Sequence, residues 1–266
     1  MSKEFDIIQL DLGNSVLKNC GNQLRDQLVG CMHAHNELAT FNRIFIFSMN
    51  STGEGELHDS AHSVQTWSIL QVLAGKLCEC WKMIYDRFIK QNPLDITLDQ
   101  LDPGQKESLH YLQRYFDPKN KGSNPLLIFR DKTAFHYEKL NLEQSLPHLA
   151  DGESTIYLAQ HPANSLYYVG TSLVFRAVFA MIYNAVKGTN SLTHAEKMKH
   201  GFTLTVEHTS IVNLHMHQLL YGLIRQMLSK AVGKPIESLA QIRIKILDAP
   251  DPDQVGLPAF IDIGQA

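Results

Sequence analysis

A long run of apolar residues at helical spacing is the feature that most constrains the fold of this chain. Between positions 61 and 88 apolar side chains recur at every third or fourth residue, at Ala61, Val64, Trp67, Leu70, Ala74, Leu77, Trp81, Ile84 and Phe88. This spacing places them on one face of a long α-helix. Asp59 or Ser60 is expected to cap its start, and the Gln91-Asn92-Pro93 stretch is expected to end it.

Other segments show the same helical period. Residues 165–186 and 203–231 carry apolar positions three and four apart, and Gly188 and Gly233 follow them as stop signals. Residues 12–47 and 103–116 also read as helices, whereas the polar, glycine-containing residues 48–58 read as a mobile loop. We therefore expect a mainly α fold, an antiparallel helical bundle formed by residues 1–235 as a single domain.

The pattern changes near the C-terminus. Ile242-Arg243-Ile244-Lys245-Ile246 alternates apolar and charged residues as a strand does, and residues 249–258 are rich in proline and aspartate. Residues 236–266 are therefore expected to form a short, irregular C-terminal extension that contains one short strand.

Composition excludes several classes of protein. Hydrophobic residues make up 44% of the 266 residues and the formal charge is −3, so a disordered chain is excluded. A nucleic-acid binder that is basic over its whole surface is excluded too, although a local basic patch is not. The apolar stretch Leu173–Val186 is interrupted by Arg176 and Asn184 and is shorter than the roughly 20 residues of a bilayer span.

The cysteines and the N-terminus indicate the compartment. Cys20, Cys31, Cys78 and Cys80 match no zinc-site spacing and are expected to be reduced and mostly buried thiols. Reduced thiols suit a reducing cytoplasm. Because the first residues also lack the pattern of a signal peptide, we expect a soluble cytoplasmic protein with no membrane partner.

The segment that carries a chemistry is NPLLIFRDKTAFHY, residues 124–137. Asn124 followed by Pro125 is a strong helix start, with a side-chain cap and then proline at the first helical position. Arg130 and His136 follow in the same segment, about 240° apart on a straight helix at about 100° per residue. A shared site therefore needs the reach of the arginine, a distortion of the helix, or convergence across a symmetric partner.

The string Arg-Asp-x4-His, within I-F-R-D-K-x-A-F-H-Y, resembles the signature of the HEPN superfamily, in which an arginine is followed after four to six residues by a histidine. The resemblance implies a helical bundle that forms a homodimer with two motifs facing each other. It also implies a metal-independent endoribonuclease that acts in phage defence or stress response. Some toxin-type members carry a tyrosine two positions after the histidine; here Glu138 occupies that position and Tyr137 precedes it, so the abortive-infection branch is nearer.

The resemblance also implies roles for individual residues. His136 would act as general base or acid, Arg130 would clamp the phosphate, and Asp131 would orient one of them; these residue types suit metal-free RNA cleavage, with no cofactor. The residues expected to contact RNA are Lys119, Lys121, Lys132 and Tyr137.

Two other interpretations concern the same residue types. His208 and His215 are seven residues apart, about 10 Å along a helix at about 1.5 Å per residue, which is too far for one metal ion. No metal site is therefore expected.

The alternative to an enzyme is an inactive dimerisation or interaction module, in which Arg130 pairs with Glu79 or Asp131 and His136 packs at a helix contact. RNA is the expected partner of the enzyme, and a protein partner or antitoxin is left open.

Overall fold

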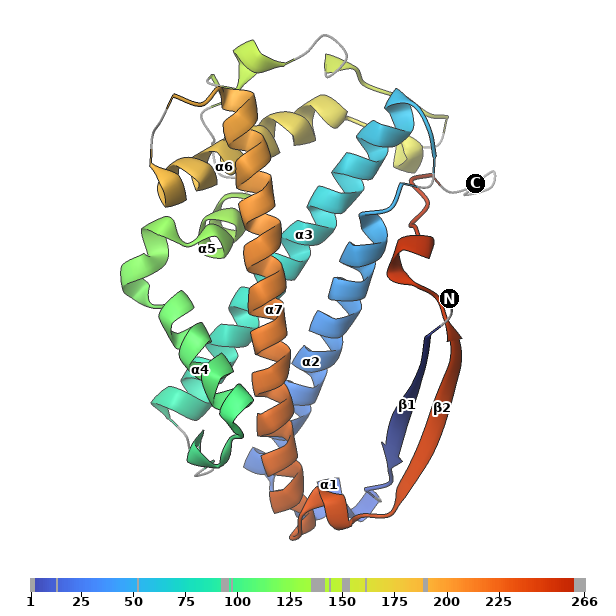
Figure 1. Cartoon of the computed structure of the whole chain (residues 1–266), viewed down its shortest axis with the longest axis vertical. Coiled ribbons are helices and arrows are strands. Elements are labelled where there is room, and N and C mark those ends of the chain that lie inside the picture. Colours follow the sequence, from blue (N-terminus) through green and yellow to red (C-terminus); the bar gives the residue numbers. More distant parts are fainter. Residues whose placement is uncertain are drawn as a thin grey trace.

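A computed structural model describes residues 3–12, 14–51, 53–91, 96, 98–134, 142–143, 145–149, 154–160, 162–188 and 191–260. The fold is mainly helical, as expected, and it is organised around α7 (His194–Val232), which runs along the whole bundle (Figure 1). Helices α2 (Asn22–Ser48) and α3 (Glu56–Ile84) pack against one side of α7, and α4 (Pro103–Tyr115) and α5 (Pro125–Phe129) against the other. Helix α6 (Tyr168–Lys187) crosses one end of the bundle.

Helix α7 begins well before the residues at which its apolar pattern starts. Thr193 and Glu196 form a reciprocal capping box, in which the threonine Oγ1 accepts from the Glu196 N–H and a Glu196 carboxylate oxygen accepts from the Thr193 N–H. The helix ends at Gly233, whose φ of 75° is the left-handed conformation that favours glycine. The expected C-terminus is therefore confirmed, and the expected N-terminus near position 203 is wrong by nine residues.

The first two long helices are close to expectation, apart from one boundary. The N-terminal helical region divides at Gly21 into α1 (Asn14–Asn19) and α2. Helix α3 starts at Glu56, after Gly55 at φ 94°, so the expected caps Asp59 and Ser60 lie inside the helix and that prediction is wrong. At its other end α3 continues as a π-helical segment, Tyr85–Lys90, and stops before the predicted breaker.

The segment between α2 and α3, expected to be a mobile loop, is tied to the C-terminal extension. The Asn50 side-chain amide donates to the carbonyl oxygens of Pro252 and Val255, at 2.7 and 2.8 Å. The side-chain amide of Gln65, in α3, donates to the carbonyl oxygen of Pro258 at 3.2 Å.

Short 3-10 helices lie between or after the main elements, at Leu98–Gln100, Pro118–Ser123, Leu146–His148, Pro162–Asn164, Ile236–Ser238 and Pro252–Gln254.

The strand expected around Ile244 is part of β2 (Gln241–Ala249), which pairs antiparallel with β1 (Lys3–Leu10). In this register Ile7 lies opposite Ile244, and the two strands form a ribbon at one side of the helices (Figure 1). Strand β1 has no counterpart among the sequence-based expectations. Several apolar side chains of the ribbon are exposed, namely Ile7, Ile8, Ile242, Ile244 and Leu247.

The core runs through the whole bundle, and one part of it lies where α6 meets α5 and α7. Phe129, Phe179 and Ile182 are almost fully buried there. Helix α6 is long and apolar enough to cross a membrane by length and composition alone, but 44% of its most apolar window is buried inside the bundle. Its buried residues, which include Phe175, Val178 and Phe179, pack against α5 and α7, which is consistent with a soluble protein.

The four cysteines are free, as expected. Cys31, Cys78 and Cys80 are buried and Cys20 is partly buried.

Candidate functional site

The segment that precedes Arg130 is fixed by its helix start, as the sequence predicts. The side-chain oxygen of Asn124 accepts from the Leu127 N–H at 3.1 Å, and its side-chain amide donates to the Tyr115 carbonyl oxygen at 2.6 Å. Asn124 is only 3% exposed, so both bonds lie inside the protein. Because Tyr115 is the last residue of α4, Asn124 caps α5 and joins it to α4 at the same time.

Helix α5 is short. Its C-terminal residue is held by packing, and the chain then continues as a π-helical segment. The Phe129 ring is buried and stacks on Phe179 of α6, with centroids 5.6 Å apart. Directly after it, residues Arg130–Ala134 form a π-helical segment against α3. Gln71 of α3 donates a side-chain hydrogen bond to the Thr133 carbonyl oxygen of this segment. A helix distortion, one of the three ways in which Arg130 and His136 could share a site, therefore begins at Arg130, and such wide turns are frequent at functional sites.

Arg130 lies in a cluster of four charged side chains. Its Nε and Nη2 both donate to Oδ1 of Asp131, at 2.9 and 2.7 Å, and its Nη1 lies 3.9 Å from Oε1 of Glu79 on α3. The other carboxylate oxygen of Asp131 lies 4.0 Å from Lys121 Nζ. Two cations and two anions thus balance one another. The Arg130 side chain is 25% exposed, so solvent still reaches it.

The guanidinium of Arg130 stays charged although it is partly buried. Burial alone would lower its pKa, but the hydrogen bond to Asp131 and the nearby negative charges outweigh this, and the pKa is raised. Behind it, burial raises the pKa of the Cys78 thiol to about 12, against the opposing effect of the Arg130 charge. Cys78 is therefore a neutral thiol at physiological pH and does not serve as a nucleophile.

The structure brings together some of the predicted site residues. Arg130, Asp131 and Lys121 are in one cluster, joined by Glu79. Lys119 is exposed on the same 3-10 helix as Lys121, and Lys132 is partly buried in the π-helical segment. His136 and Tyr137 lie outside the described residues, so their predicted roles stay predictions.

A cavity of about 440 Å³ between α2 and α3 adjoins this cluster, because Glu79 lines both. Lys76 and Glu37 form an ion pair at 2.5 Å on its wall, and His33 Nε2 lies 3.7 Å from the same glutamate. Arg87 adds a second cation. The cavity is charged, and the sequence gives no local signal for it because its walls come from two helices.

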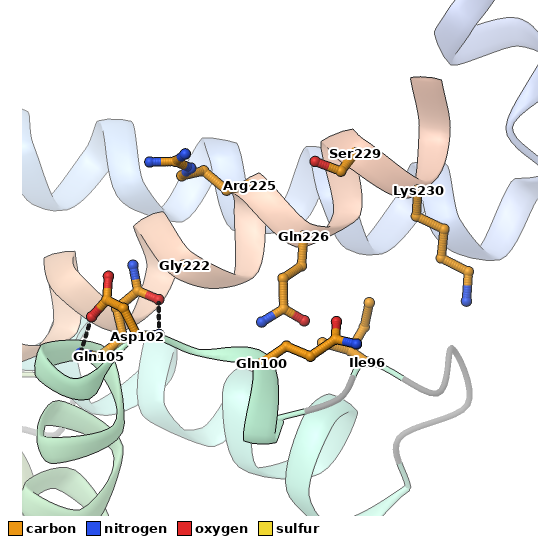
Figure 2. A pocket seen from close by; sticks show the side chains of 9 residues that line it. All are labelled: Ile96, Gln100, Asp102, Gln105, Gly222, Arg225, Gln226, Ser229 and Lys230. Atoms are coloured by element: carbon orange, nitrogen blue, oxygen red, sulfur yellow. Dashed lines mark hydrogen bonds between the residues drawn. The ribbon is translucent and has the colours of Figure 1, made fainter. Parts of the chain in front are cut away.

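A second polar cavity, of about 510 Å³, lies between the last turns of α7 and the start of α4 (Figure 2). Asp102 and Gln105 at its edge are occupied by the reciprocal capping box of α4. Arg225 is paired with Glu237 and lies over the Tyr221 ring. Most of the charged groups on this cavity already have partners, and none of its lining residues belongs to the segment that the sequence singles out as carrying a chemistry.

The histidines of α7 have partners of their own. His208 Nδ1 lies 3.2 Å from the Tyr115 hydroxyl, and His215 Nδ1 lies 3.0 Å from the Ser108 hydroxyl. Across the described part of the chain, no three or more His, Cys, Asp or Glu side chains are grouped closely enough to hold a metal ion.

Comparison of the chain with protein-family models, with curated proteins and with solved structures gives no match.

Proposed function

We propose that the chain is a HEPN-like, metal-independent endoribonuclease of the cytoplasm, which acts as a homodimer in phage defence or stress response. The observation that carries the proposal is the setting of Arg130. Its guanidinium stays charged and partly exposed where a capped helix turns into a π-helical segment, six residues before His136. Arginine in such a position suits a phosphate clamp.

In the proposed reaction His136 takes the proton of a ribose 2′-hydroxyl, and the freed oxygen attacks the adjacent phosphorus. The bond from phosphorus to the 5′-oxygen breaks, and that oxygen leaves with a proton supplied by the acid of the site. Negative charge grows on the non-bridging phosphate oxygens during this step, and the Arg130 guanidinium stabilises it. The products are a cyclic phosphate and a free 5′-hydroxyl.

The charged cluster supports this role and indicates which nitrogen of Arg130 would contact a phosphate. The 3.9 Å distance between Arg130 Nη1 and Glu79 is too long for a hydrogen bond, so this nitrogen can turn to a phosphate. Asp131 holds the other edge of the guanidinium through Nε and Nη2 and so fixes its plane. Glu79, 57% exposed, opposes an incoming phosphate by its charge, and Lys121 offsets part of that repulsion.

The alternative is an interaction module without catalysis. It is favoured by the same pairing of Arg130 with Asp131 and Glu79, because an arginine that is already balanced by two acids can be purely structural. The two functions differ in whether Arg130 and His136 are needed for a chemical step.

The experiment is RNA cleavage by the purified protein in excess EDTA. Single-stranded RNA is incubated with the wild type and with the Arg130→Ala, Arg130→Lys and His136→Ala variants. His33→Ala is the matched control, because His33 lines the neighbouring cavity but lies outside the motif. Thermal unfolding of each variant shows whether it folds, and Arg130→Lys keeps a cation beside Asp131 and Glu79 in case Arg130→Ala does not fold.

The expected result is EDTA-resistant cleavage that falls at least about 100-fold in Arg130→Ala and in His136→Ala and is unchanged in His33→Ala. Arg130→Lys should retain only a part of the activity, since lysine keeps the charge but not the two-pronged contact. No cleavage by the wild type, or equal cleavage by wild type and motif variants, would refute the enzyme and leave the interaction module.

A further inference from the structure

A largely apolar cavity of about 450 Å³ lies at the end of the bundle where α3 and α7 begin, and none of its lining residues belongs to the Arg130 cluster. Figure 1 shows the starts of these two helices at the same end of the molecule, where α6 crosses. The apolar and aromatic side chains that line it are Met49, Trp67, Phe179, Ala195, Met198 and Phe202. Its volume is within the range of small-molecule sites, about 300–1,000 Å³.

The aromatic wall of this cavity is rigid. Trp67 of α3 stacks on Phe175 of α6, with centroids 5.3 Å apart and planes 25° apart. Phe179 packs edge-on against Trp67 at 6.3 Å, and Phe202 packs edge-on against Phe179 at 5.4 Å. Because three helices supply these rings, the wall is held in place by the packing of the bundle.

Two polar groups on the lining can still bind a ligand: among the described residues, a ring nitrogen has no hydrogen-bond partner and a cation has no nearby carboxylate. The Nε2 atom of His62 is buried and has no hydrogen-bond partner among the described residues. Buried polar atoms without partners are uncommon in folded proteins, and one on a cavity wall can take its partner from a bound molecule. Lys199 is exposed on the cavity rim, and no described carboxylate lies within 4.0 Å of its ammonium group.

We propose that this cavity binds an amphipathic carboxylate, a fatty acid of medium chain length. The apolar chain lies against Trp67 and the phenylalanines, where it leaves water. The carboxylate receives a charge-assisted hydrogen bond from Lys199 and a hydrogen bond from the protonated Nε2 of His62. The inference does not depend on the ribonuclease proposal, because it involves none of the same residues.

Binding is measured by calorimetry with two probes of equal chain length, decanoate and decanol. The variants are Lys199→Gln, which removes the cation, and Lys197→Gln, a matched control on the opposite side of the same helix and outside the lining. Ala195→Phe, at an exposed position on the lining, narrows the cavity. Bromine-tagged decanoate tests the location, since it quenches the fluorescence of a tryptophan that it touches, and Trp67 is on the wall.

The wild type and Lys197→Gln are expected to bind decanoate about tenfold more tightly than decanol, and Lys199→Gln is expected to lose this preference. Bromodecanoate should quench the wild type, and Ala195→Phe should weaken both probes. The proposal is overturned if decanoate does not bind, if bromodecanoate binds without quenching, if the wild type binds both probes equally, or if Lys199→Gln keeps the preference.

Discussion

The contact between α6 and α7 depends on the absence of a side chain at Gly201. A Cβ at this position would lie 1.9 Å from the carbonyl oxygen of Phe179 and 2.5 Å from the carbonyl carbon. An ordinary carbon–oxygen contact is about 3.3 Å or longer, so Gly201→Ala would force the two backbones apart by roughly 1.4 Å. Backbone on both sides must move, because no flexible side chain can give way.

The expected cost follows from two opposing effects. Overpacking a filled core costs about 1–3 kcal/mol, and the upper end applies here because helices rather than rotamers must shift. Alanine is favoured over glycine inside a helix by about 1 kcal/mol. We therefore expect Gly201→Ala to lower the free energy of unfolding by about 2 kcal/mol.

Gly170 supplies the matched control, since it lies in the first turn of α6 and a Cβ there would meet no atom within 4 Å. Gly170→Ala should raise the stability by about 0.5 kcal/mol, because only the helix preference remains. Urea unfolding followed by circular dichroism measures both variants against the wild type. If Gly201→Ala proved as stable as Gly170→Ala, the close approach of α6 and α7 would be refuted.

Three further predictions concern acid, the cap and the site. Burial, with His35 and Arg43 nearby, lowers the pKa of His217 to about 4, so the unfolded chain binds this proton first and stability falls as the pH drops from about 6.5 to about 4. The full pKa shift corresponds to about 3 kcal/mol of stability, and we expect a loss of about 1–2 kcal/mol because the ring is only half-buried. Urea unfolding across this pH range should show this loss. A His217→Gln variant that loses as much stability as the wild type would contradict the prediction. Asn124→Ala should lower the free energy of unfolding by about 2 kcal/mol in the same urea measurement, because it removes the helix cap and a buried hydrogen-bond donor. A change below about 0.5 kcal/mol would contradict the hydrogen bonds of Asn124 to Leu127 and Tyr115. If the proposed function holds, Glu79→Gln should tighten RNA binding about two- to fivefold in fluorescence anisotropy, and unchanged or weaker binding would show that Glu79 does not oppose the phosphate.

Much of the helical fold could be predicted from local patterns in the sequence. The end of α6 at Gly188 and the start of α5 at Asn124 are set by residues that act within one helical turn, and both are confirmed. The start of α7 was missed because its first turns carry few apolar residues, although Thr193 and Glu196 have the spacing of a capping box. Apolar spacing thus located the buried part of that helix and not its boundary.

What could not be predicted depends on contacts between distant residues. The ion pair between Glu79 and Arg130 was expected only as one alternative, because a sequence does not state which faces of two helices meet. The π-helical segment after Phe129 has no local signature, since it depends on how α5 fits between α3 and α6. Strand β1 was missed because its partner lies near the other end of the chain.

The pairing of β1 with β2 has a consequence for the order in which the protein is made. Lys3 pairs with Ala249, so β1 leaves the ribosome before the α-helices and has no partner until all of α1 to α7 have been synthesised. The entropic cost of closing so long a loop falls only when the helices have folded and drawn the two segments together. An apolar strand edge that waits unpaired is a site of wrong association. The nascent chain is therefore most prone to aggregation just before β2 emerges, and β1 is the segment on which a chaperone would act.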